Sequence, residues 1–104
     1  MPKVWIADDD DAIRMILDEH LKSEGLDVSS FSDGESLLNE LDKDVPDLVI
    51  SDIKMPGVNG YDLLKHLNNN YEDVPVIIMT AFTDMQAAVD AYGGGAFEYL
   101  PKPF

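Results

Sequence analysis

The chain contains no cysteine among its 104 residues, which excludes disulfide bonds, zinc–thiolate sites and thiol nucleophiles. Cationic residues are scarce: seven lysines and arginines stand against 21 aspartates and glutamates, and the formal net charge is −14. Such a surface repels phosphate backbones and attracts cations, so we expect no direct binding to nucleic acid. No apolar run approaches the roughly 20 residues of a membrane helix, and the N-terminus is unlike a signal peptide. We therefore expect a cytoplasmic protein that contacts no membrane.

Short apolar runs alternate with amphipathic stretches along the whole chain. The apolar runs predict five strands, at Val4–Ala7, Leu26–Phe31, Leu48–Ile50, Val76–Met79 and Phe97–Leu100. The amphipathic stretches predict four helices, at 11–24, 33–43, 61–67 and 84–92. In the first helix the apolar residues at helical spacing are Ile13, Ile16, Leu17 and Leu21. Alternating strands and helices favour one α/β domain over residues 1–104, with a doubly wound, five-stranded parallel sheet.

Polar residues stand where the predicted strands end. Asp8–Asp11 follow the first strand, Asp52 ends the third, Thr80 ends the fourth, and Lys102 comes shortly after the fifth. Because ligands of such sheets bind beyond the carboxyl ends of the strands, we expect these residues to form a site. Two carboxylates about 4 Å apart repel each other by on the order of 4 kcal/mol at an effective dielectric constant of about 20. Such a cluster stays ionised only if a cation or a lysine joins it, and oxygen ligands without histidine or cysteine favour Mg²⁺ over zinc.

The four consecutive aspartates have different expected roles. Asp8 and Asp9 lie nearest the strand and are the better metal ligands. Asp10 is expected either behind those ligands or in solvent. Asp11 directly precedes the helical pattern, which is typical of an N-cap or a first-turn residue that complements the helix dipole.

Several motifs in combination match one known family. An apolar strand ends in the acidic pair Asp8–Asp9, and the third strand leads into Ser-Asp-Ile-Lys-Met-Pro-Gly-Val-Asn-Gly. The fourth strand reads Ile-Ile-Met-Thr-Ala, and the chain closes with Tyr-Leu-Pro-Lys-Pro-Phe. From Val4 to Phe104 the chain resembles the response-regulator receiver domains of bacterial two-component systems. The longer stretches Val-Ile-Ile-Met-Thr-Ala and Gly-Ala-Phe-Glu-Tyr-Leu-Pro-Lys-Pro-Phe are similar to those of the nitrogen-regulatory, NtrC-type transcriptional activators.

This resemblance implies a flavodoxin-like fold with strand order 2-1-3-4-5 and a signalling switch rather than an enzyme. Asp52 would accept a phosphoryl group from a sensor histidine kinase, and the switch would catalyse only its own phosphorylation and dephosphorylation. Asp8, Asp9, Asp52 and the backbone carbonyl of Lys54 would hold Mg²⁺. Lys102 would contact the phosphoryl group, and a cis peptide bond before Pro103 would aim it there.

The resemblance also implies how phosphorylation would change the surface. Thr80 would be the switch hydroxyl and Tyr99 the switch aromatic, with Tyr99 filling the space that Thr80 leaves. The altered face, around the fourth helix and the fifth strand, would control an effector domain and so transcription. Without the resemblance, Tyr99 is expected to be a half-buried core residue.

The chain departs from the family at its C-terminal end. It stops at Phe104, before the fifth helix of the family, and it includes no effector domain. We therefore expect a C-terminally truncated receiver domain with an uncovered apolar strip of a few hundred Å² on one face of the sheet. Such a strip favours marginal stability, or a homodimer or exchanged dimer formed through that face or through the helix-four and strand-five face.

Three other interpretations stay open. A hydrolase of the haloacid dehalogenase type also has a nucleophilic aspartate after its first strand, but the stretch Asp8–Ala12 lacks the last residue of the motif Asp-x-Asp-x-Thr or Val. A receiver-shaped scaffold would bind partners without being phosphorylated. Flavin binding is disfavoured because four acids replace the loop that would hold the phosphate.

His20 and His66 lie on polar helical faces and are expected at the surface.

Overall fold

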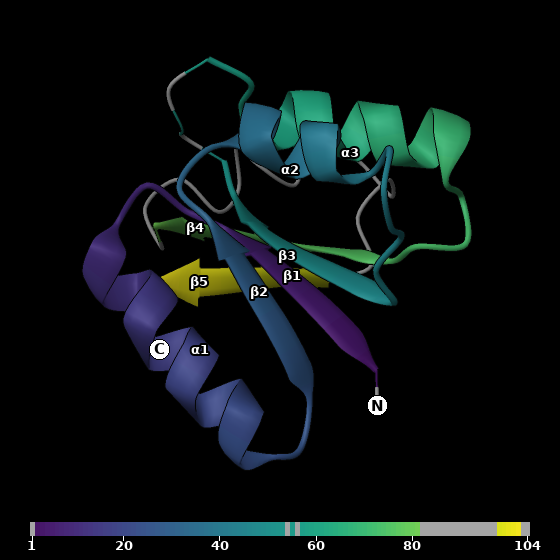
Figure 1. The fold of residues 1–104 in the computed structure, drawn as a ribbon. Coiled ribbons are helices and arrows are strands. Elements are labelled where there is room, and N and C mark those ends of the chain that lie inside the picture. Colours follow the sequence, from purple (N-terminus) through teal and green to yellow (C-terminus); the bar gives the residue numbers. More distant parts are fainter. Residues whose placement is uncertain (1, 54, 56, 82–97, 103–104) are drawn as a thin grey trace.

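Continuous apolar strands pair into one parallel sheet, as the alternation of strands and helices predicts. In a computed structural model of the chain, the described residues are 2–53, 55, 57–81 and 98–102, with Ala81 and 98–102 described by their backbone alone. The strands are β1 (Lys3–Ala7), β2 (Asp27–Phe31), β3 (Leu48–Asp52), β4 (Val76–Ala81) and β5 (Glu98–Lys102). They lie in the order β2-β1-β3-β4-β5 (Figure 1). The predicted parallel α/β sheet is confirmed.

Helices cover both faces of this sheet. The described residues form α1 (Asp11–Ser23), α2 (Gly34–Glu40) and α3 (Gly60–Asn70). Helix α1 lies against one face, whereas α2 and α3 lie side by side on the other (Figure 1). Within the part of the chain that the structure describes, no helix has the length and apolar character needed to cross a membrane.

The strand β1 divides its side chains between the two faces because successive residues of a strand point to opposite sides. Val4 and Ile6 join the apolar cluster that also includes Met79 and faces α1. Trp5 and Ala7 join the larger cluster beneath α2 and α3. These four residues of β1 are buried, which agrees with the place of the strand between β2 and β3.

Among the described helices, α1 packs less deeply on the sheet than α3 does. No residue of α1 is buried, whereas α3 buries Gly60, Leu63, Leu64 and Leu67. Ile16 shares the helical spacing of the other apolar residues of α1, but 59% of its surface is exposed. The remaining predicted apolar residues of α1, Ile13, Leu17 and Leu21, pack as partly buried side chains against the sheet.

Several element boundaries differ from the predicted ones. Helix α3 starts at Gly60 and continues to Asn70, beyond the predicted end at Leu67, because three asparagines carry no apolar signal. Helix α2 ends earlier than predicted, at Glu40, and turns follow it. Strand β5 extends through Lys102 rather than ending at Leu100. The predicted helix at 84–92 lies outside the described residues.

Candidate functional site

The ends of β1 and β3 bring two aspartates together. Ala7 pairs with Ser51, so Asp8 follows β1 beside Asp52, the last residue of β3. The side chain of Asp8 is fully buried, that of Asp52 is half-buried and that of Asp9 is exposed. One carboxylate oxygen from each of the three residues lies within 4.8 Å of the other two. The predicted acidic cluster of Asp8, Asp9 and Asp52 is therefore present as a group in space.

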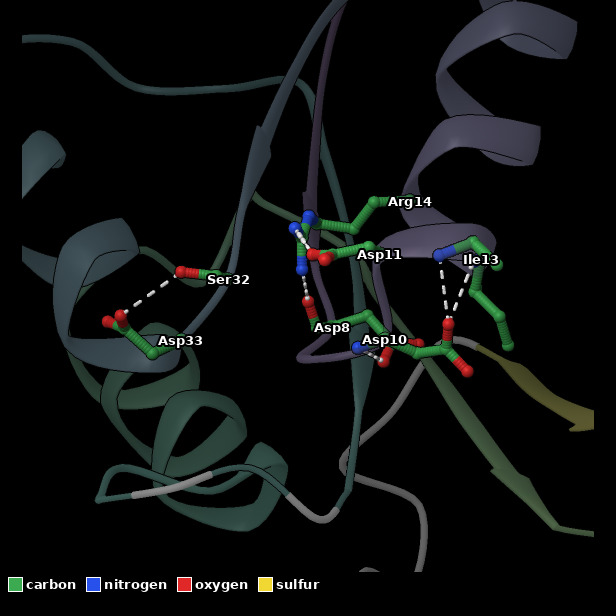
Figure 2. A network of polar contacts seen from close by, with 8 residues as sticks. Asp8, Asp10, Asp11, Ile13, Arg14, Ser32 and Asp33 are labelled. Carbon is green, nitrogen blue, oxygen red and sulfur yellow. Dashed lines mark hydrogen bonds and ion pairs between the residues drawn. The ribbon is translucent and has the colours of Figure 1, made fainter.

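Backbone hydrogen bonds hold two of these carboxylates in place. The Asp8 Oδ1 accepts from the backbone N–H of Asp10 at 2.9 Å, as Figure 2 shows. The Asp52 Oδ1 accepts from the backbone N–H of Ile53 at 2.8 Å. The main chain of Asp8 is itself tied to β2 by a bond from its N–H to the carbonyl of Phe31 at 3.1 Å. The carboxylates are thus oriented by the strand ends, and not by long flexible linkers.

The remaining two aspartates of the run have structural roles in α1. Asp10 is the N-cap: its Oδ1 accepts from the N–H groups of Ala12 at 2.9 Å and Ile13 at 3.3 Å (Figure 2). Asp10 is also exposed, which agrees with one of its two expected positions, whereas its capping role was not predicted. Asp11 is a first-turn residue, one of its two predicted positions, and forms an ion pair with Arg14.

A glycine sets the distance between Asp52 and the start of α3. A Cβ atom at Gly60 would lie 2.3 Å from the carbonyl oxygen of Asp52 and 2.9 Å from the Cα of Ile53. The N–H of Gly60 also donates to the carbonyl of Ile53 at 2.9 Å. The sequence does not reveal this role of Gly60, because a glycine in a Gly-Val-Asn-Gly segment predicts only a turn.

The other predicted site residues lie on β4 and β5. Thr80 is 4% exposed and pairs with Pro101, while Ala81 pairs with Lys102. Lys102 is therefore the last residue of β5, at the same edge of the sheet as Asp52, rather than following the strand. The side chains of Tyr99 and Lys102 lie outside the described part of the chain, as do all of Lys54 and Pro103.

The donor atoms of the acidic cluster fit a hard divalent cation. Mg²⁺ binds oxygen ligands at about 2.1 Å, which places neighbouring ligands about 3.0 Å apart and opposite ones about 4.2 Å apart. The three carboxylate oxygens lie within 4.8 Å of one another, so small side-chain rotations would let them surround one ion. The described cluster consists of aspartates alone, a donor set that suits Mg²⁺ better than zinc or copper.

Comparison with known proteins gives a consistent picture. The family model of the response regulator receiver domain matches residues 4–104. The chain is 48% identical over 101 residues to the DNA-binding transcriptional regulator NtrC of Escherichia coli K12, which covers 97% of the chain and 22% of that regulator. It is 41% identical over 102 residues to the C4-dicarboxylate transport transcriptional regulatory protein DctD of Pseudomonas aeruginosa. That match covers 98% of the chain and 22% of DctD. The chain thus spans about a fifth of the length of these relatives.

Solved structures resemble this fold closely. The response regulator TrrA of Thermotoga maritima, in complex with Mg²⁺-BeF, has a TM-score of 0.87 at 31% identity. The match covers 100% of this chain and 89% of the TrrA chain. The chemotaxis response regulator CheY4 of Vibrio cholerae has a TM-score of 0.91 at 30% identity. This match covers 100% of this chain and 88% of the CheY4 chain.

Proposed function

Because the chain belongs to the response regulator receiver domain family, we propose that Asp52 is the phosphoacceptor of a receiver whose sheet includes β5 as its fifth strand. Receiver domains are phosphoacceptor signalling switches rather than conventional enzymes. The observation that carries the assignment is the cluster of Asp8, Asp9 and Asp52 at the carboxyl ends of β1 and β3. Asp52 suits the role better than Asp8, since it is half-buried whereas Asp8 is fully buried and less accessible to a phosphoryl donor.

The proposed reaction is the transfer of a phosphoryl group from a histidine of a sensor kinase. A carboxylate oxygen of Asp52 attacks phosphorus as the P–N bond breaks; the electron pair of that bond stays on the ring nitrogen, which takes up a proton. Such a transfer depends mainly on positioning and on neutralising charge. Asp8, Asp9, Asp52 and the backbone carbonyl of Lys54 would hold Mg²⁺, which when bound offsets the negative charge of carboxylates and phosphate.

The same proposal assigns the switch to residues of β4 and β5. Thr80 is buried near the end of β4, next to the strand that ends in Asp52, and its hydroxyl would donate to a phosphoryl oxygen on Asp52. Lys102 would contact the phosphoryl group, and Tyr99 would move into space that Thr80 leaves. Attack of water on the phosphorus would release inorganic phosphate, restore the carboxylate of Asp52 and return the switch to its resting state.

We propose further that this receiver is part of a longer transcriptional regulator. The chain matches about a fifth of the length of longer transcriptional regulators, so the partners would be a sensor histidine kinase and an effector domain joined to the receiver. The similarity to NtrC favours nitrogen regulation of transcription as the output, in the cytoplasm. The net charge of −14 leaves DNA binding to the effector domain.

Incubation with acetyl phosphate, with and without Mg²⁺, followed by intact mass measurement tests the assignment. We expect one phosphoryl adduct that requires Mg²⁺ and that is lost in Asp52→Asn, because the amide keeps the shape but not the nucleophile. The exposed Asp42→Asn removes the same charge elsewhere and should be labelled like the wild type. Labelling that survives Asp52→Asn and disappears in Asp8→Asn would favour the haloacid-dehalogenase-type hydrolase. A chain that is never labelled would favour the scaffold.

A further inference from the structure

The side chain of Arg14 connects α1 to the acidic cluster. Its Nη1 donates to the backbone carbonyl of Asp8 at 2.6 Å, and its Nη2 pairs with the carboxylate of Asp11 (Figure 2). The side chain is only 19% exposed. Two other described cations pair elsewhere, Lys3 with Asp44 and Lys22 with Asp18.

The carbonyl that Arg14 binds belongs to the peptide unit between two proposed metal ligands. A peptide unit is planar, so fixing the carbonyl of Asp8 also fixes the N–H of Asp9 and the directions in which both residues leave the plane. A hydrogen bond from a charged donor to a carbonyl is stronger than a neutral one. Arg14 therefore limits rotation of the one link that sets the spacing between the buried carboxylate of Asp8 and the exposed carboxylate of Asp9.

The position of Arg14 is itself well determined. Its backbone N–H donates to the carbonyl of Asp10 at 3.1 Å, the first hydrogen bond of α1, and Asp10 caps the same helix. Asp11 holds the second arm of the guanidinium. The planar fork of arginine can serve both partners at once, which the single ammonium of lysine does less well.

We propose that Arg14 is a positioning residue that sets the Asp8–Asp9 peptide for binding of a divalent cation. This inference rests on the proposed function, because it concerns the same acidic cluster. It also predicts the direction in which Mg²⁺ affinity changes when Arg14 is removed, and this direction distinguishes positioning from a simple charge effect. If Arg14 acted only through its charge, its removal would leave the cluster more negative and would strengthen Mg²⁺ binding. If Arg14 acts by positioning, its removal weakens binding.

Calorimetric titration of the metal-free chain with Mg²⁺ measures the effect directly. We expect Arg14→Ala to raise the Kd for Mg²⁺ by about tenfold, the usual consequence of losing a residue that orients metal ligands. Arg14→Lys should recover part of the affinity, because an ammonium can still donate to the carbonyl of Asp8. The matched control is Lys22→Ala, which removes the same charge from the same helix at a 56% exposed side chain, and should leave the Kd within about twofold of wild type.

A second readout follows the peptide unit itself. In metal-free protein, the NMR shift of the Asp9 amide should move in Arg14→Ala and stay in place in Lys22→Ala. Circular dichroism verifies that each variant is folded during the titration. Arg14→Gln, which keeps a neutral donor, replaces the alanine variant if that chain unfolds, and its Kd should rise in the same direction.

The outcomes separate this inference from the proposed function. An Arg14→Ala chain that binds Mg²⁺ as tightly as wild type, or more tightly, would overturn the positioning role alone. A lower melting temperature with an unchanged Kd and an unmoved Asp9 amide would do the same, since it would reveal a purely structural residue. A wild-type chain that binds no Mg²⁺ would overturn the proposed function and this inference with it.

Discussion

At the scale of single residues, environment gives identical side chains different tasks. Asp8 is buried and bonded to the N–H of Asp10, whereas Asp9 is exposed beside it. Asp10 uses its carboxylate to cap α1, and Asp11 uses its own to hold Arg14. Only the first two remain near Asp52, so the negative charge of the site comes from three carboxylates and not from the whole acidic run.

A substitution at Asp9 tests this division. We predict that Mg²⁺ stabilises the wild-type fold by roughly 2.7 kcal/mol when its concentration is about a hundredfold above Kd, because only the native cluster binds it. Asp9→Ala should lose most of this gain and should be more stable than wild type in metal-free buffer, where one repelling charge is gone. Thermal melts with and without millimolar Mg²⁺ measure both effects. If the melting temperature of the wild-type chain does not change with Mg²⁺, the assignment of the cluster as a metal site is contradicted.

Gly60 provides a second test at this scale. Alanine normally favours a helix over glycine, but a Cβ at Gly60 would lie 2.3 Å from the Asp52 carbonyl oxygen. We predict that Gly60→Ala destabilises the fold by about 1 to 3 kcal/mol, as overpacking does, and slows labelling of Asp52 by acetyl phosphate.

The matched control is a glycine away from the site. Gly25 has a φ of 86° with open space around its Cβ position, so Gly25→Ala should cost about 1 kcal/mol of backbone strain. Its labelling rate should stay at the wild-type value. Equal labelling of Gly60→Ala and wild type would show that α3 can shift without moving Asp52.

At the scale of elements, each described helix begins with a polar cap. Asn59 and Asp62 form a capping box at α3, with the Asp62 N–H donating to the Asn59 side chain at 2.9 Å. This cap fixes the start of α3 at Gly60. The helices therefore start close to the edge of the sheet where the acidic cluster lies, and their caps help to hold the loops that carry it.

The cap of α2 makes stability depend on pH. The hydrogen bond from the backbone N–H of Ser36, 2.7 Å long, holds the pKa of Asp33 below its ordinary value. A carboxylate with a lowered folded-state pKa contributes stability above the unfolded-state pKa, and this contribution is lost as the pH falls through the folded-state value. We predict that wild type is more stable than Asp33→Asn at pH 7 and that the difference shrinks below about pH 4, where free aspartate titrates.

Melting curves of both chains between pH 7 and pH 3 give this difference directly. Asparagine is the matched replacement because it is an equally good N-cap and lacks only the charge. A difference in melting temperature that is constant across this range would assign the effect to shape rather than to ionisation.

At the scale of the whole molecule, charge and apolar exposure act in opposite directions. The net charge of −14 disfavours contact between copies at low salt. On α1, where no side chain is buried, Met15 and Ile16 are 63% and 59% exposed. We propose that copies associate through this helix once salt screens their charge.

Light scattering over a series of protein concentrations, at low and at physiological ionic strength, tests this prediction. The apparent mass should rise with protein concentration, and more strongly at the higher salt, where the Debye length is about 8 Å. Met15→Lys should suppress the rise, whereas Met55→Leu, a conservative change at a buried position, should not. A constant monomer mass under all conditions would contradict self-association through α1.

Much of the fold was predictable from the sequence because strands and helices have local periods. Apolar runs located the strands, and acids at the ends of two of them located the edge of the sheet that carries the candidate site. The order of elements along the chain then favoured a parallel sheet, since crossovers through helices leave successive strands parallel. Asp8, Asp9 and Asp52 were placed together by this reasoning, which needs only a strand direction and not a side-chain position.

Contacts between residues of different elements were decided by tertiary structure alone. Periodicity could not reveal that Gly60 touches the backbone of Asp52, or that Arg14 reaches the carbonyl of Asp8. Nor could it reveal that Ile16 is exposed, because helical spacing gives the face of a helix but not how much of that face the sheet covers. The physical reason is common to all three: local pattern determines which elements form, whereas the packing of layers determines which atoms meet.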